Sequence, residues 1–159
     1  MSDPTDILSA YDAAVRLLVA AGVPALRRVA AYEGEMADLF DRIKTEPLPV
    51  ALVICTGAEI VRTDADTRDW QSEWAVVVVA GSLRSREEAA RGAADRAGAY
   101  ALVHQVVDVL DGARVGSPSA EPTEVQAVRL VDLPTPQLAA WQVTAAARLT
   151  EYLSTQSEE

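Results

Sequence analysis

The spacing of apolar residues predicts an amphipathic helix near the start of the chain. Within residues 3–22, apolar side chains recur at intervals of three and four: Ile7, Leu8, Tyr11, Ala14, Val15, Leu18 and Val19. Asp3 is a suitable N-cap ahead of Pro4, and Gly22 is a typical residue at a helix C-terminus. A brief second helix with the same periodicity is expected over residues 35–43.

Runs of β-branched and alternating residues predict the strands that follow. A short strand is expected over residues 27–34, a proline-led strand over 48–62 and a third over 73–82. The consecutive valines of "EWAVVVVAGS" indicate a strand covered on both faces, either at the centre of a sheet or against another subunit. The polar stretch 63–72 is expected to connect the last two of these strands.

The longest predicted helix covers residues 85–111. Ser85 and Glu88 match the capping-box pattern at its start, and Gly112 is a natural stop. Gly92 and Gly98 each cost about 1 kcal/mol relative to alanine inside a helix, so we expect a break or an irregular first half.

Three further strands are expected, near residues 113–116, 123–133 and 138–153. The last shows a period of two, with Trp141, Val143, Ala145, Ala147 and Leu149 alternating with polar residues. Residues 154–159 read as a frayed tail. The order α-β-α-β-β-α-β-β-β predicts an α+β fold, a mainly antiparallel sheet with helices packed on one face, in one domain spanning residues 1–159.

Composition narrows the possible functions. Half of the residues are hydrophobic but only 5% are aromatic, so Ala, Val and Leu must build most of the core. The formal net charge of −10 disfavours sequence-specific nucleic-acid binding. The N-terminus lacks the features of a signal peptide and no apolar run could span a bilayer, so we expect an intracellular product without a membrane role. Cys55 lies in an apolar run and is expected to be a buried structural thiol.

His104, the chain's only histidine, shares a predicted helix face with Asp108. Such a pair can orient an imidazole for catalysis, but a nucleophile or a metal partner is also needed. No HExxH or GxSxG motif, phosphate loop or Cys/His metal cluster is present. We therefore expect no catalytic, cofactor or metal site and interpret the segment as a packing helix. An enzyme using His104 and Asp108 remains the alternative from a different class.

Two polar segments are candidate protein interfaces. Residues 84–96 interleave four arginines (Arg84, Arg86, Arg91 and Arg96) with acidic residues, either as a solvated helix face or as a surface that pairs with a neighbouring subunit. The stretch "TRDWQ" places Arg68 and Trp70 in a predicted connection, where burial in the core is least expected. Tryptophan and arginine are frequent interface anchors, so this segment is predicted to be a contact loop, against the alternative of an ordinary hairpin tip.

Several of these segments resemble, in the same order, the Mu-like phage tail proteins. The shared elements are "YEGE", the proline-led "PVALV", the strand "VVVVA", the arginine-rich turn and "GAYALVHQVVDVLDG". The resemblance extends over roughly residues 7–150. It covers positions that form the fold, so no individual functional residue can be transferred from it.

The resemblance implies a tail terminator of a contractile-tailed phage, a prophage or a related phage-like particle. Such proteins are small α+β subunits that form a six-membered ring on the tail tube, stop its polymerisation and offer a joining surface to neck and head. Their partners are copies of themselves, the tube protein and possibly sheath and neck proteins, within the virion, which is assembled in the host cytoplasm. An acidic lumen would let DNA pass. Another head–tail neck adaptor is the alternative from the same biology.

Overall fold

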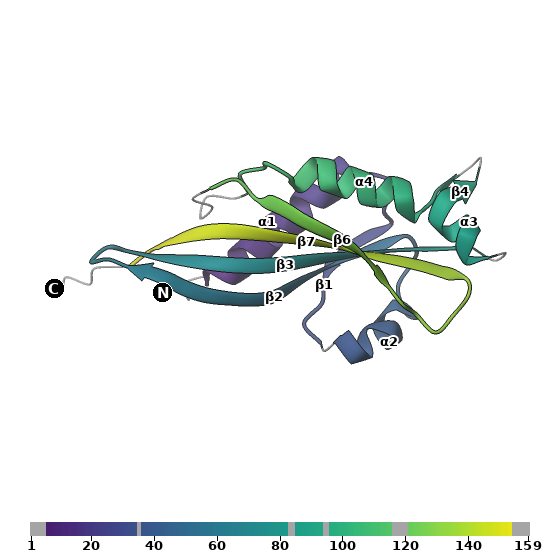
Figure 1. Ribbon diagram of the computed structural model, residues 1–159, viewed down its shortest axis with the longest axis horizontal. Helices are drawn as coiled ribbons and strands as arrows, with labels where there is room; N and C mark the ends of the chain where they lie inside the picture. Colours follow the sequence, from purple (N-terminus) through teal and green to yellow (C-terminus); the bar gives the residue numbers. More distant parts are fainter. Residues whose placement is uncertain (1–5, 35, 83–84, 94–95, 116–120, 154–159) are drawn as a thin grey trace.

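The computed structural model describes residues 6–34, 36–82, 85–93, 96–115 and 121–153. Its helices are α1 (Ile7–Gly22), the 3-10 helix η1 (Met36–Asp38), α2 (Leu39–Ile43), α3 (Arg86–Arg91) and α4 (Ala99–Leu110). Its strands are β1 (Arg28–Ala31), β2 (Val50–Thr63), β3 (Thr67–Gly81), β4 (Gly92–Ala93), β5 (Arg96–Ala97), β6 (Glu124–Val131) and β7 (Leu138–Tyr152). Figure 1 shows how the helices lie about one long, twisted sheet.

The main sheet has the strand order β1-β2-β3-β7-β6. All neighbours are antiparallel except β1 and β2, which are parallel. β3 lies at the centre, and its valines are buried on both faces, as predicted from the run "VVVV". The α+β class with a mainly antiparallel sheet is therefore confirmed.

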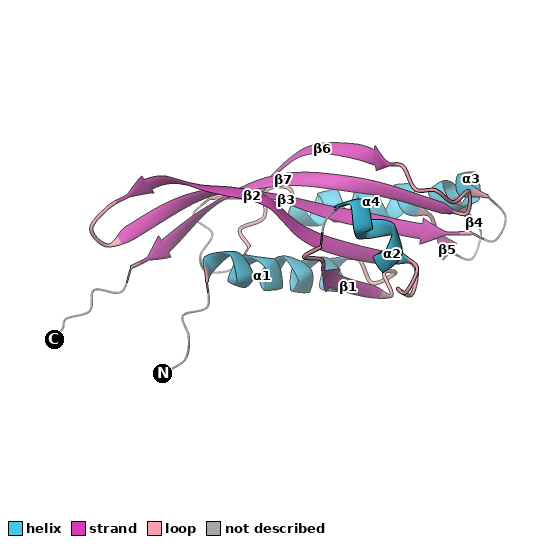
Figure 2. Ribbon diagram, turned by 90° about the horizontal axis from the view of Figure 1, so that it is seen from below, coloured by secondary structure: helices cyan, strands magenta, loops and turns pink. Residues whose placement is uncertain are grey.

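The prediction that the helices pack on one face needs a correction, because the two faces of the sheet are covered by different helices (Figure 2). On one side, here called the helix face, α1, α3 and α4 pack over Ala51, Val76 and Val143. On the opposite face, the short α2 buries Leu39 and Ile43 against a second apolar cluster. The parallel strands β1 and β2 require a crossover segment, and α2 lies within it, so one helix is added to the face that α1, α3 and α4 leave open.

The predicted helix boundaries need two corrections. α1 begins at Ile7 rather than near residue 3, because Asp6 is the N-cap and its carboxylate accepts a hydrogen bond from the Ser9 amide at 2.8 Å. The predicted long helix is two helices, α3 and α4, separated by the two-residue strands β4 and β5. Gly92 adopts a φ of 89°, which ends α3, so the break expected from the glycines is confirmed.

The strand predictions hold best where burial is greatest. β6 and β7 confirm the strands expected after residue 123, and Val143, Ala147 and Leu149 of β7 are buried as the alternation predicts. Residues 113–115 form no strand, and the backbone of Ala113 is used in contacts with the Leu110 carbonyl and the Thr123 amide. Residues 116–120 and the tail 154–159 lie outside the described residues.

The far end of the sheet projects beyond the helices and is here called the distal arm. It consists of residues 55–63 of β2, 67–72 of β3 and 147–152 of β7. Figures 1 and 2 show this end of the sheet extending past the start of α1. The predicted connection 63–72 is therefore wrong: the turn covers only residues 64–66, and β3 begins at Thr67.

Candidate functional site

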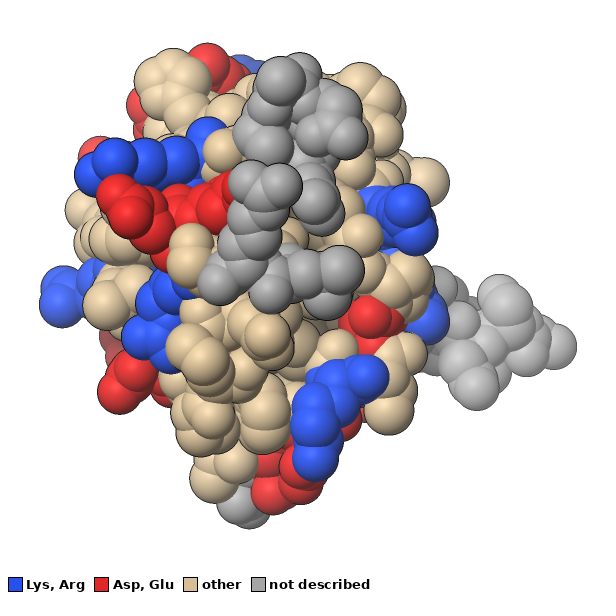
Figure 3. Space-filling model, turned by 90° about the vertical axis from the view of Figure 1, so that its right-hand side faces the viewer, with Lys and Arg blue, Asp and Glu red and all other residues tan. Residues whose placement is uncertain are grey.

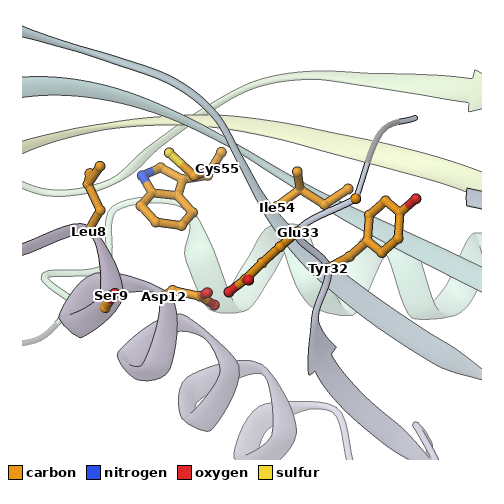
Figure 4. A pocket seen from close by; sticks show the side chains of 9 residues that line it. Leu8, Ser9, Asp12, Tyr32, Glu33, Ile54 and Cys55 are labelled. Carbon is orange, nitrogen blue, oxygen red and sulfur yellow. The ribbon is translucent and has the colours of Figure 1, made fainter. Parts of the chain in front are cut away.

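A pocket of about 270 Å³ lies where the distal arm meets the core (Figure 4). It is lined by Leu8, Ser9, Asp12, Tyr32, Glu33, Gly34, Ile54, Cys55 and Trp74. Asp12 from α1 and Glu33 from the segment after β1 point toward one another across it. Two facing carboxylates and a thiol are the chemistry that this pocket offers.

Cys55 is exposed rather than buried, which corrects the sequence prediction. The residue lies where β2 passes beyond β1, next to a β-bulge between Cys55 and Gly57. Partial burial of the thiol raises its pKa, and the Asp12 carboxylate acts in the same direction. A raised pKa keeps the thiol protonated at neutral pH, whereas nucleophilic cysteines need a lowered pKa. The pocket therefore does not activate Cys55.

His104 and Asp108 form a pair on α4, with Nε2 and Oδ2 3.4 Å apart. The sequence prediction that they share a helix face is confirmed. The His104 side chain is 78% exposed, so it does not pack in the core although the helix that carries it does. It lies at a shallow groove lined otherwise by aliphatic and aromatic side chains, and among these lining residues there is no serine, threonine or cysteine.

Arg68 and Trp70 lie on the helix face of the distal arm, in strand β3 and not in a loop. Trp70 Nε1 donates a hydrogen bond to Glu151 Oε1 at 3.0 Å, and Arg68 Nη1 lies 3.4 Å from the same oxygen. Trp70 also packs against the apolar cluster under α1. Both side chains are partly exposed and take part in cross-strand contacts, so an interface role for them stays a prediction. Trp74, the next tryptophan, is a core residue.

The arginine-rich segment divides into residues with different contacts. Arg86 donates from Nε to the Leu138 carbonyl at 3.1 Å and from Nη2 to the carbonyls of Leu133 and Thr135. Arg91 is exposed and pairs with Glu87 one helical turn away. Arg84 and the side chain of Arg96 lie outside the described part of the structure. Figure 3 shows this end of the molecule with side chains of both charge signs interspersed.

An apolar surface between α4 and β6 was not identified from the sequence. A groove of about 360 Å³ is lined by Tyr100, Val103, His104, Val107, Val128 and Trp141. β6 is the last strand of the sheet, and its helix-face residues Val128 and Leu130 are 41% and 57% exposed. The alternation of Val128, Arg129 and Leu130 in the sequence predicts one apolar face for this part of the strand. Only the fold shows that no helix covers it completely.

The described residues include neither a metal-binding cluster nor a helix that could span a membrane. Among them, no group of three or more His, Cys, Asp or Glu side chains is arranged to hold a metal ion. Within the same ranges, no helix combines the length and apolar character needed to cross a bilayer.

The fold is shared with a component of a phage-like particle. It resembles a chain of a structure described as the virion of native gene transfer agent (GTA) particle, with a TM-score of 0.58 and 16% sequence identity. The likeness covers 93% of this chain and 100% of that chain. The sequence family described as bacteriophage Mu, Gp37 matches residues 6–152. The chain belongs to this phage family, and the resemblance predicted from the sequence is confirmed. No curated protein sequence matches it.

Proposed function

We propose that the protein is a virion structural protein of a phage or phage-like particle, and specifically a tail terminator. The observation that carries this proposal is the match of the bacteriophage Mu Gp37 family to nearly the whole chain. The virion fold supports the structural role. In this role, copies of the chain form a ring, of six members by the resemblance, on the end of the tail tube. The ring stops tube growth and presents a surface to the neck.

The surface chemistry fits assembly better than catalysis. The pocket at the base of the distal arm does not activate Cys55. The His104–Asp108 pair is exposed, and the other side chains that line the groove at His104 are aliphatic or aromatic. Exposed apolar side chains lie both on the arm and on β6, at Ile60, Val61, Val128 and Leu130. Such side chains gain from burial against another protein. Tube, sheath and neck proteins are the proposed partners besides the chain itself.

Deletion of the gene in the phage or particle that carries it tests this function. Loss of a terminator is expected to give tails of uncontrolled length, whereas loss of a neck adaptor would give tails of normal length that lack heads. Electron microscopy of lysates distinguishes the two. Normal virions without the protein would overturn the proposal.

Complementation separates the structural role from the enzymatic alternative. The variant Asp108→Ala removes the carboxylate of the candidate catalytic pair and leaves both the buried face of α4 and the lining of the groove between α4 and β6 intact. We expect it to restore normal tails as the wild type does. Failure of this folded variant to do so would favour the alternative in which the pair is functional.

A further inference from the structure

Three strand edges of the sheet have no strand pairing among the described residues: the short outer edge of β1, the part of β2 beyond β1, and β6. On one side, β1 pairs with β2 only along Val50–Val53, so the outer edge of residues 55–63 is left without a neighbouring strand. On the other side, β6 ends the sheet. The Val125 amide donates to Asp111 Oδ1 at 3.0 Å, so the open part of the β6 edge begins at residue 126. Open edges of this kind are templates for pairing with another chain.

The directions of the two edge strands suit a repeating contact. The main sheet runs β2, β3, β7, β6 with each pair antiparallel, so β2 and β6 point in opposite directions. A second copy in the same orientation would therefore place its β2 antiparallel to β6 of the first, with the helix faces of both copies on the same side. This joins two different surfaces, which is the kind of contact that closes into a ring.

We propose that the β2 edge of one copy pairs with the β6 edge of the next copy, with Glu59 opposite Arg129. The inference rests on the proposed ring and names the two surfaces that would form it. In this register Ile60 lies opposite Val128, and Ala58 lies opposite Leu130. The antiparallel pattern keeps opposed residues on the same face, so the two apolar pairs and the charged pair fall on different faces.

The proposed register is supported by the faces of the sheet to which the side chains of the two edge strands point. Ala58 and Ile60 lie opposite Ser72 and Trp70 of β3, on the helix face, whereas Glu59 lies opposite Gln71 and faces the other way. On β6, Val128 and Leu130 lie opposite Val143 and Trp141, also on the helix face, and Arg129 faces away with Gln142. The pattern apolar-charged-apolar is thus repeated on both edges with opposite charges in the middle.

The exposed apolar area on each side supports a second copy as the occupant. Ile60 is 49% exposed, and in the proposed register it would extend the apolar surface of the groove formed by Tyr100, Val103 and Trp141. One contact would therefore cover both surfaces that the single chain leaves open. Pairing with a peptide of another protein is an outcome that the test below separates from this proposal.

In the proposed register, β6 of the first copy and β1 of the next copy do not compete for the same stretch of the β2 edge. Through the pairings with β7 and β3, Val131 of β6 lies level with Val50 of β2 in its own chain. In the proposed contact Val131 lies opposite Gly57 of the next copy, a stagger of about seven residues, or roughly 20 Å along the strands. The stagger moves the next copy's β1 past the end of β6. A constant stagger also tilts the strands of successive copies, as in closed barrels.

Disulfide capture between copies tests the register. In a Cys55→Ser background, Glu59→Cys with Arg129→Cys should give a ladder of covalent oligomers under mild oxidation. Each single variant should stop at dimers or below. Within one chain, the two positions are separated by three strand spacings and are also staggered along the strands, so they lie at least about 14 Å apart, which is too far for an internal disulfide. Lys44→Cys with Arg129→Cys provides a control pair of exposed positions and should give no ladder.

Charge exchange gives a second, independent readout. Glu59→Arg or Arg129→Glu should each reduce the oligomer yield of the wild type by about fivefold in sedimentation, and the double variant should restore it. Unchanged circular dichroism and denaturation midpoints would show that the fold is retained. The proposal is overturned if the cysteine pair gives only monomers, if the control pair gives the same ladder, or if a host protein is captured instead.

The deletion experiment keeps this inference separate from the proposed function. If deletion gives abnormal tails but the cysteine pair gives no disulfide ladder, the terminator role is supported and this interface is contradicted. If the cysteine pair gives a ladder but deletion gives normal tails, the interface is supported and the terminator role is contradicted.

Discussion

At the residue scale, a few buried polar contacts tie α1 to the sheet. Tyr11 Oη lies 2.5 Å from Thr123 Oγ1, and the Tyr11 ring packs on Trp74 with centroids 4.9 Å apart. Trp74 Nε1 donates to Ser72 Oγ, which in turn donates to the Ala147 carbonyl. Each of these groups is almost fully buried, so an unmade hydrogen bond here would be costly.

Tyr11→Phe should destabilise the fold by about 1–2 kcal/mol, because the buried Thr123 hydroxyl loses its partner. Urea denaturation at pH 7 measures the change. Tyr100→Phe is the matched control, since Tyr100 is half exposed on α4 and its variant should retain wild-type stability. Equal midpoints for all three proteins would show that the Tyr11–Thr123 contact contributes nothing.

The same residue predicts a response to alkaline pH. Burial raises the pKa of Tyr11 above its ordinary value of 10.0. Above pH 10 the unfolded chain loses this proton first, so folding stability falls as pH rises. The Tyr11→Phe variant lacks this contribution, and its stability difference from the wild type should shrink between pH 10 and 11. A constant difference across that range would contradict the assignment.

Arg86 is expected to stabilise the molecule more than the other described arginine of its segment. Its guanidinium bonds to three carbonyls that lie between the ends of β6 and β7. Arg86→Ala should lower the free energy of unfolding by about 2 kcal/mol. Arg91→Ala removes only an exposed pair and should change it by less than about 0.5 kcal/mol. Chemical denaturation of both variants compares them, and equal effects would refute the distinction.

At the scale of elements, the break between α3 and α4 depends on Gly98. A Cβ at this position would collide with the Gly92 amide and lie 2.5 Å from the Ala90 carbonyl, both rigid backbone groups. Gly98→Ala should therefore destabilise the fold by about 1–3 kcal/mol. Gly57→Ala is the control, because nothing lies within 4 Å of a Cβ there. Thermal unfolding measures both, and a Gly98→Ala variant as stable as the control would contradict this packing.

The distal arm shows why the polar composition of residues 67–72 led to the prediction of a connection where the structure has a strand. These positions are mostly polar, although residues 67–71 are half-buried and Ser72 is buried, and polarity usually marks a loop. They are nevertheless a strand, since β3 pairs with β2 on one side and β7 on the other along this stretch. Backbone pairing between distant segments outweighs local polarity, and no local pattern reports that pairing.

At the scale of the whole molecule, the acidic surface predicts weak contact with DNA. With 24 acidic against 14 basic residues, the chain repels phosphate backbones. We expect no binding to duplex DNA at micromolar protein and about 0.15 M salt, by fluorescence anisotropy. This would suit a ring through which DNA passes. Micromolar binding that weakens steeply with salt would contradict the expectation and point to a clustered basic patch.

The sequence by itself determined the elements that are strongly periodic or strongly buried. The stripe of α1, the doubly covered β3, the alternation of β7 and the glycine break before α4 all follow from local spacing, because burial requires a regular apolar pattern. The order of motifs from "YEGE" to "GAYALVHQVVDVLDG" also carried the family resemblance that the match to the phage family confirmed.

Only the tertiary structure decided which surfaces remain open. Exposure at Ile60, Val128 and Leu130 depends on where the helices end relative to the sheet, which no single segment encodes. Cys55 is exposed because β2 has passed beyond β1 at this point, and His104 is exposed because it lies on the side of α4 that does not pack on the sheet. Burial results from contacts between segments far apart in the chain, so local sequence predicts the pattern of a face but not its partner.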